Sequence, residues 1–217
     1  MSGAAKVSQV EGEPGAPPTR RLLTGAILAG GRSRRLGRDK ATFLLAGKPL
    51  ALWVAEVLRP LVSQLWLITT TPEVHLPLGL PLLTDLVPAQ GPLGGLETAL
   101  FYAATPLVLA APVDTPLLAP ALLTALAGRA PRLSRPALVC GSDRDLQPFP
   151  GLYAVRLLPR LRAFLREDRR LRVFVRQIRP QFLPPEEVRR LDPQGLSFLN
   201  CNTPEALAQV RAHLGGR

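Results

Sequence analysis

The chain has 217 residues, 47% of them hydrophobic, and a formal net charge of +11. This length can bury the core of one globular domain, and the apolar content excludes an intrinsically disordered protein. No apolar run reaches the roughly 18 residues of a membrane span, and the two cysteines, Cys140 and Cys201, provide neither a disulfide framework nor a metal-ligand cluster. We interpret both cysteines as small buried side chains, and we expect a cytoplasmic protein without a secretory signal.

The positive charge is concentrated in residues 129–190, which contain fifteen arginines, no lysine and six acidic residues, a net charge of +9. Such a field favours polyanionic ligands. Codon usage explains it equally well, because the chain has 24 arginines against 3 lysines. A nucleic-acid partner is not expected, because aromatic residues make up only 5% of the chain and do not interleave with the arginines.

Residues 1–20 are rich in Gly, Pro, Ser and Glu and are expected to form a disordered leader, and residues 21–217 a single domain. Apolar runs bounded by Gly or Pro predict strands, and apolar residues at helical spacing predict helices. The predicted strands are residues 24–29, 64–69, 80–84, 107–111, 137–140 and 151–155, with a last strand ending near Phe198. The predicted helices are residues 49–58, 93–104, 120–127 and 157–166, and one that follows Thr203 as N-cap with Pro204 at its first position.

Strands that alternate with helices imply right-handed crossovers and a mostly parallel sheet that is covered on both faces. We therefore expect a Rossmann-like three-layer α/β/α fold. Ligands of such sheets bind beyond the carboxyl ends of the strands. Four predicted strands end in glycine-rich or polar segments, namely residues 30–40, Asp85, Asp114 and residues 200–202. The sequence therefore predicts a binding site at this edge of the sheet.

The segment from Leu28 to Lys40 reads Leu-Ala-Gly-Gly-Arg-Ser-Arg-Arg-Leu-Gly-Arg-Asp-Lys. Its adjacent glycines let backbone N–H groups approach phosphate oxygens without a Cβ in the way, and Arg35 and Lys40 add positive charge. The segment lacks both the Gly-Lys-Ser/Thr of a P-loop and the Gly-x-Gly-x-x-Gly of a dinucleotide site. Because the other lysines lie only at positions 6 and 48, we favour a phosphate site over an ordinary basic loop.

Each polar residue after the later strands allows more than one interpretation. The carboxylate of Asp114 suits Mg²⁺ that bridges phosphate oxygens, but Asp-Thr-Pro also forms turns and caps. Asp85 can accept hydrogen bonds from the N1–H and N2–H₂ groups of guanine, orient a ribose or serve the structure alone. Asn200 and Asn202 are the only asparagines in the chain, which indicates either a demanding binding geometry or helix capping.

Together these motifs resemble those of the molybdenum cofactor guanylyltransferases, within the nucleotidyltransferase superfamily. The resemblance covers roughly residues 22–210, and Leu36 stands where methionine is common. It rests on the following segments of this sequence: residues 28–40, Asp85 with residues 91–95, residues 114–116, residues 170–176 and residues 200–205.

The resemblance implies a transfer of GMP from GTP to the terminal phosphate of molybdenum-loaded molybdopterin, with Mg²⁺ as cofactor. It implies that the nucleotide is bound by Leu28, Ala29, Gly30, Gly31, Lys40, Asp85, Gly94 and Asp114. Arg35, Lys40 and Asp114 would catalyse the transfer, with Asp114 also holding the metal. Arg170, Arg172, Asn200 and Asn202 would bind the acceptor, although an arginine-rich helical face is more often merely solvated.

Other functions remain open at this point. A cytidylyltransferase or sugar-nucleotide synthase can share the fold, as can a non-catalytic chaperone that binds the nucleotide or cofactor. Family members often have an asparagine after the second strand, where this chain has threonines at residues 69–71, so the choice between GTP and CTP stays open. We expect transient contacts with cofactor-insertion proteins or molybdoenzymes, and neither a nucleic acid nor a membrane as a partner.

Overall fold

The computed structural model describes residues 19–30 and 39–215. Gly31 and Arg35 lie outside the described residues, as does nearly all of the predicted leader. The strands are β1 Leu23–Leu28, β2 Leu44–Leu45, β3 Lys48–Pro49, β4 Gln64–Thr69, β5 Leu82–Thr84, β6 Leu107–Pro112, β7 Ala137–Gly141, β8 Leu146–Ala154 and β9 Gln181–Leu183. The helices are α1 Leu50–Leu58, α2 Pro72–His75, α3 Gly91–Tyr102, α4 Pro120–Gly128, α5 Leu158–Leu165, α6 Leu171–Gln177, α7 Pro185–Leu191 and α8 Pro204–Gly215.

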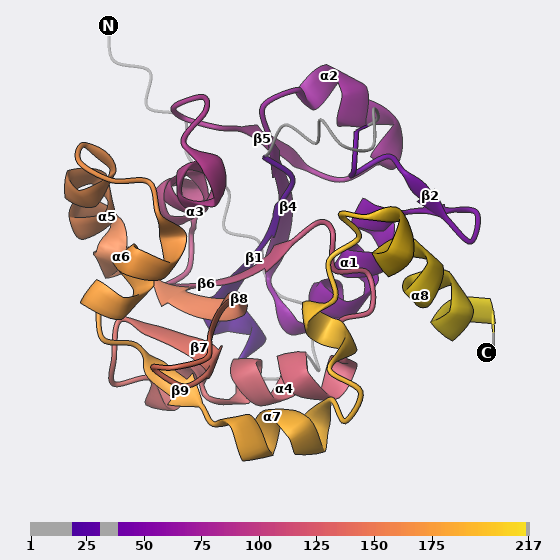
Figure 1. Cartoon of the computed structure of the whole chain (residues 1–217). Helices are drawn as coiled ribbons and strands as arrows, with labels where there is room; N and C mark the ends of the chain where they lie inside the picture. Colours follow the sequence, from indigo (N-terminus) through magenta and orange to yellow (C-terminus); the bar gives the residue numbers. More distant parts are fainter. Residues whose placement is uncertain (1–18, 31–38, 216–217) are drawn as a thin grey trace, which may run out of the picture.

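Seven strands form one sheet in the order β5-β4-β1-β6-β8-β7-β9, and β2 pairs with β3 in a separate hairpin (Figure 1). All neighbouring strands of the large sheet are parallel except at β8, which runs antiparallel to both β6 and β7. The prediction of a mostly parallel sheet is therefore confirmed. No helix among the described residues is long and apolar enough to cross a membrane.

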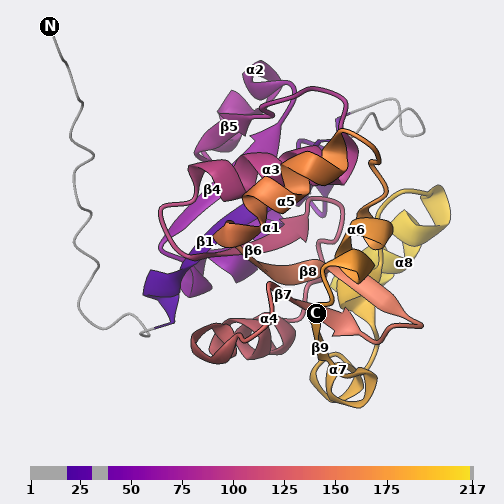
Figure 2. The same ribbon diagram turned by 90° about the vertical axis from the view of Figure 1, so that its left-hand side faces the viewer.

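Helices cover both faces of the sheet, as the three-layer prediction requires (Figures 1 and 2). Alternate side chains of a strand point to opposite faces, so the buried strand β1 serves both layers. Its Leu23 and Ile27 pack in the core beneath α1 and α4, whereas Ala26 and Leu28 pack in the core beneath α3 and α5. Helix α8 packs at the end of the molecule on a third cluster, which contains the buried Cys201.

The strand order places a crevice beside β1. From β1 the chain runs outward through β4 to β5 and then returns to β6 on the other side of β1. In open α/β sheets, ligands bind at such a reversal, outside the carboxyl ends of the strands. The residues that follow β1 and β6 therefore face the expected ligand site.

Two strand predictions are corrected by the structure. Residues 196–198 form a 3-10 turn, η6 Leu196–Phe198, instead of a last strand, and further along the chain Cys201 N donates to Asp114 O at 2.8 Å. Strand β8 begins at Leu146, before the predicted start, because its register against β7 shifts around Pro148 and Pro150. A bulge tolerates prolines, since its residues donate no ladder hydrogen bond.

Candidate functional site

A cleft of about 400 Å³ opens at the carboxyl ends of β1 and β6. Segments from six separate parts of the sequence meet in it, and most of the predicted site residues line it. The predicted residues that line the cleft are Leu28, Ala29, Gly30, Lys40, Asp114, Arg172, Asn200 and Asn202.

The ammonium group of Lys40 lies at the centre of this arrangement. Its Nζ donates to Asp114 Oδ2 at 2.8 Å and also to Asn202 Oδ1. The side chains of Lys40 and Asp114 are only 22% and 13% exposed, so water screens this ion pair weakly. A half-buried cation is thus held between a carboxylate and an amide, and its third N–H is left for a ligand oxygen.

Backbone hydrogen bonds fix the loops that carry these groups. Beyond the end of β1, Ala29 N donates to Ile68 O at 2.8 Å and Val113 N donates to Leu28 O at 3.1 Å. The turn at Asp114 is closed by Thr115 Oγ1, which donates to Pro112 O at 3.0 Å. The hydrogen bonds of the sheet therefore continue past the ends of β1 and β6 to the edge of the cleft. They fix the direction in which the two loops leave the sheet.

Cys201 lies behind the asparagines and takes no part in the chemistry that we infer. Burial, and then the charge of Asp114, raises the pKa of the Cys201 thiol to about 11, although Lys40 lowers it in part. The thiol is therefore neutral at physiological pH. It fills space beneath the site, as the sequence indicated.

Asp85 lies directly behind the glycine wall of the cleft. A Cβ on Gly30 would come within 3.1 Å of Asp85 Oδ2, and a Cβ on Gly95 would come within 3.8 Å of Oδ1 and 3.2 Å of a Leu28 methyl. Oδ1 is buried without a hydrogen-bond partner among the described residues, and burial raises the pKa of the carboxyl above 3.8. A buried acceptor left unpaired is costly unless a ligand supplies the donor.

Gly94 lies next to this wall, at the start of α3, and does not line the cleft itself. A Cβ there would lie 2.9 Å from Gln90 Cβ, so only glycine allows the start of α3 to fold this closely. Thr98 Oγ1 donates to Gly94 O and accepts from Leu86 N, both at 3.0 Å. This pair of bonds ties the segment after Asp85 to α3.

The opposite wall contains residues that sequence reasoning missed. Gln147, Pro148 and Phe149 line the cleft because β8 is antiparallel to β6, so its first residues lie beside Asp114. Leu171 at the start of α6 completes this wall. A signal was present in the prolines that flank Phe149, but they indicate a loop rather than a strand that starts in a bulge.

The two arginines predicted to bind the acceptor are placed differently. Arg172 lines the cleft, and no ion pair involves it among the described residues. Arg170 does not line the cleft: its guanidinium is 76% exposed and pairs with Asp168 through bonds of 2.7 to 3.0 Å. This pairing lowers the pKa of the Asp168 carboxyl to about 2.

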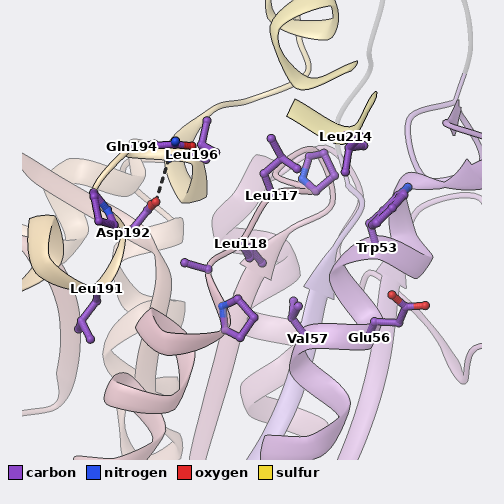
Figure 3. Close-up of a pocket in the computed structure, with 14 residues that line it drawn as sticks. Trp53, Glu56, Val57, Leu117, Leu118, Leu191, Asp192, Gln194, Leu196 and Leu214 are labelled. Atoms are coloured by element: carbon purple, nitrogen blue, oxygen red, sulfur yellow. Dashed lines mark hydrogen bonds between the residues drawn. The ribbon is translucent and has the colours of Figure 1, made fainter. Parts of the chain in front are cut away.

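A second hollow of about 420 Å³ lies between α1, α4 and the segment after α7, and Figure 3 shows its lining. None of the predicted site residues lines it. Its walls are mainly apolar, with Trp53 and Leu117 among them, and its charged residues are the acidic Glu56 and Asp192. A triphosphate requires cations or free N–H donors, so this hollow is not the phosphate site.

A metal at the cleft would depend on its substrates for ligands. Within the described part of the chain there is no cluster of three or more His, Cys, Asp or Glu residues. Asp114 is the carboxylate that lines the cleft, and its Oδ1 has no hydrogen-bond partner among the described residues. One carboxylate beside amide oxygens suits Mg²⁺, which is commonly held by one or two carboxylates together with substrate phosphates.

Comparisons with known proteins identify the family of the chain. Residues 25–182 match the family model described as the MobA-like NTP transferase domain. The molybdenum cofactor guanylyltransferase of Cereibacter sphaeroides is 37% identical over 203 residues, which are 88% of this chain and 97% of that protein.

Solved structures share the fold. The molybdopterin-guanine dinucleotide biosynthesis protein A of Archaeoglobus fulgidus superposes with a TM-score of 0.77 at 26% identity, covering 89% of this chain and all of that one. A Mycobacterium tuberculosis protein solved as a complex with manganese shares the fold at a TM-score of 0.59 and 20% identity, covering 80% of this chain and 99% of that one. The chain is a nucleotidyltransferase that belongs to the MobA-like NTP transferase family, among its molybdenum cofactor guanylyltransferases.

Proposed function

We propose that the protein transfers GMP from GTP to the terminal phosphate of molybdenum-loaded molybdopterin and releases pyrophosphate. The observation that carries this proposal is the Lys40 ammonium, which lies between Asp114 and Asn202 in a cleft at the carboxyl edge of the sheet. The acceptor phosphate is itself an anionic nucleophile. Catalysis then requires positioning and charge neutralisation, without a nucleophile from the protein.

The nucleotide half of the site supports guanine as the base. Asp85 offers two carboxylate oxygens behind Gly30 and Gly95, and Oδ1 has no partner among the described residues. Guanine presents two adjacent donors, N1–H and N2–H₂, which a carboxylate can accept together. Cytosine has a single amino donor at the corresponding edge, beside the acceptors N3 and O2, so it cannot supply two adjacent donors to the carboxylate. This chemistry supports a guanylyl rather than a cytidylyl donor.

The reacting phosphates would lie against Lys40 and the residues after β1. The ammonium can donate to a phosphate oxygen in addition to its protein partners and so neutralise charge that moves to the pyrophosphate. Arg35, which lies outside the described residues, remains a proposed second cation. Ala29 N is already bonded to Ile68 O, so the backbone donors for phosphate must come from the glycines that follow.

We propose Mg²⁺ as the metal, held by Asp114 through Oδ1 and assisted by the amide oxygens of Asn200 or Asn202. When bound, the ion withdraws negative charge from the triphosphate oxygens. Lys40 keeps the other carboxylate oxygen of Asp114 occupied at 2.8 Å and so orients the carboxylate for that role. The manganese bound by the Mycobacterium tuberculosis relative supports a divalent ion in this fold.

The acceptor would enter from the wall formed by β8 and α6. Arg172 provides a cation with no ion pair among the described residues, and Asn200 and Asn202 provide amide groups on the other side of the cleft. Because Arg170 is already paired with Asp168, we assign the main phosphate contact to Arg172. Phe149 adds an apolar surface against which a flat ring can lie.

The test is pyrophosphate release with each of the four nucleoside triphosphates, with and without molybdenum-loaded molybdopterin. We expect release with GTP that depends on both the acceptor and Mg²⁺, and a slower reaction with CTP. Faster turnover of CTP would replace the guanylyl assignment with a cytidylyl one. Tight binding of GTP with no turnover under any condition would identify a nucleotide-binding chaperone instead.

A further inference from the structure

A fully buried histidine, His75, contacts the loop that carries Lys40. His75 ends the short helix α2, which lies beside β5 (Figures 1 and 2), and its side chain has no exposed surface. Its Nε2 is 2.7 Å from Asp39 Oδ1. Asp39 directly precedes Lys40, so this contact ties the glycine-rich loop to a different part of the fold.

The chemistry of this contact argues against simple filling of the core. His75 Nδ1 is buried and has no partner within the part of the chain that the structure describes. A leucine or phenylalanine would fill the same space without the desolvation cost of that nitrogen. We therefore attribute the presence of a histidine at this buried position to its Nε2, which donates a charge-assisted hydrogen bond to Asp39.

The contact orients the turn that carries Lys40. Asp39 Oδ1 also accepts from Thr42 N at 3.1 Å, which closes the turn over residues 39–42. On its far side the turn is held by α1, because Ala51 N donates to Ala41 O at 3.2 Å. Lys40 thus lies between two anchored residues, His75 fixing the one before it and α1 the one after it.

We propose that His75 is a positioning residue for Lys40: through Asp39 it holds the lysine turn so that the ammonium faces the triphosphate. The inference rests on the proposed function only for the identity of the nucleotide. A misplacement of about 1 Å in a catalytic group can cost about 10²-fold in rate. Loss of the contact should therefore lower kcat by about tenfold or more, with little effect on recognition of the base, because Asp85, to which we assign the base, lies beside Gly30 and is not part of the turn over residues 39–42.

Two amide variants of His75 provide the test. In His75→Gln the side-chain nitrogen reaches the position of Nε2, whereas in His75→Asn it reaches only that of Nδ1 and cannot contact Asp39. We expect His75→Asn to lose about tenfold or more in kcat and about fivefold in affinity for Mg-GTP, with unchanged affinity for guanosine. His75→Gln should recover most of both losses at a similar melting temperature. His213→Phe, which changes the other, exposed histidine, is the control and should match the wild type.

A double-mutant cycle with Lys40→Ala separates positioning from general stability. If His75 acts through Lys40, His75→Asn should change GTP affinity and kcat less than twofold in the Lys40→Ala background. Full multiplicative losses in that background, or equal values for His75→Asn and His75→Gln, would overturn the proposal. Absence of GTP turnover in the wild type would refute the proposed function alone. The affinities of the His75 variants for Mg-GTP and for guanosine, measured by titration calorimetry, would still test the role of His75.

Discussion

Replacing Lys40 by alanine removes the ammonium group that joins the turn over residues 39–42 to both Asp114 and Asn202. Removal of a preorganised charge donor from a reacting oxygen commonly costs ~10²–10³-fold in kcat, or about 2.7–4 kcal/mol. The effect on stability should be smaller. Asp114 is only 13% exposed, so removal of the lysine leaves a poorly hydrated carboxylate, and we expect a loss of about 2 kcal/mol, or roughly 4–8 °C in Tm.

The assay is steady-state pyrophosphate release, measured alongside thermal unfolding. Lys48→Ala is a matched control, because Lys48 pairs with the 65% exposed Glu56 and lies over the Trp53 ring, away from the cleft. The control should retain wild-type kcat. Wild-type kcat in Lys40→Ala, or an equal loss in both lysine variants, would refute the assignment of Lys40 to the reacting phosphates.

Three further substitutions test the rest of the site. Asp114→Asn should raise the Mg²⁺ concentration for half-maximal activity by about tenfold, because an amide is a poorer ligand for a hard cation; an unshifted titration would place the metal elsewhere. Arg172→Glu should raise the acceptor KM at least tenfold with little change in the KM for GTP, whereas Arg170→Glu should change neither; equal effects of the two variants would contradict the separate roles. Asp85→Asn should reduce the preference for GTP over CTP. Because burial raises the pKa of Asp85 above its unfolded value, its charged form destabilises the fold, and stability is lost as pH rises from about 4 through that raised pKa. Asp85→Asn removes this loss, so in urea unfolding the free energy of unfolding of the variant should rise relative to that of the wild type between about pH 4 and 7. An equal difference between variant and wild type at pH 4 and at pH 7 would contradict the buried-charge explanation.

The central part of the fold was predictable because its signals are local. The strands before Gly30 and Asp114 are apolar runs that end in a glycine pair or an Asp-Thr-Pro turn, and their buried positions agree with the prediction. Thr203 was expected to cap the last helix, and its Oγ1 accepts from Ala206 N at 3.2 Å. Such features depend on neighbours within four residues, so a single sequence carries them.

Long-range features were less accessible. The prolines around Phe149 favoured a loop, and only pairing with β6 and β7 reveals that they begin a strand. The segment before Asn200 was apolar enough for a strand, but among the described residues it pairs with no strand, and it forms a 3-10 turn. An apolar run becomes a strand only when a partner offers the matching backbone groups.

The site residues divide in the same way. Lys40 and Asn202 were both selected from the sequence, but nothing in it showed that their side chains would touch. Among the arginines, composition could not distinguish Arg172 in the cleft from Arg170, which Asp168 holds at the surface. His75 was missed because a single histidine on an apolar segment gives no local indication that its partner is Asp39.

The bond between Lys40 and Asn202 also has a consequence for the order in which the molecule is assembled. It joins residues 162 positions apart, and the bond from Lys40 to Asp114 spans 74. Contacts of such separation pay the loop-closure entropy of almost the entire domain, so they form after the local helices and hairpins. During synthesis, a growing chain that has not reached Asn202 already contains the glycine loop, Asp85 and Asp114 but lacks the amide that steadies the ammonium. The contact between Lys40 and Asn202 therefore cannot form until residue 202 has been synthesised, so the arrangement around the ammonium is completed late in the assembly of the domain.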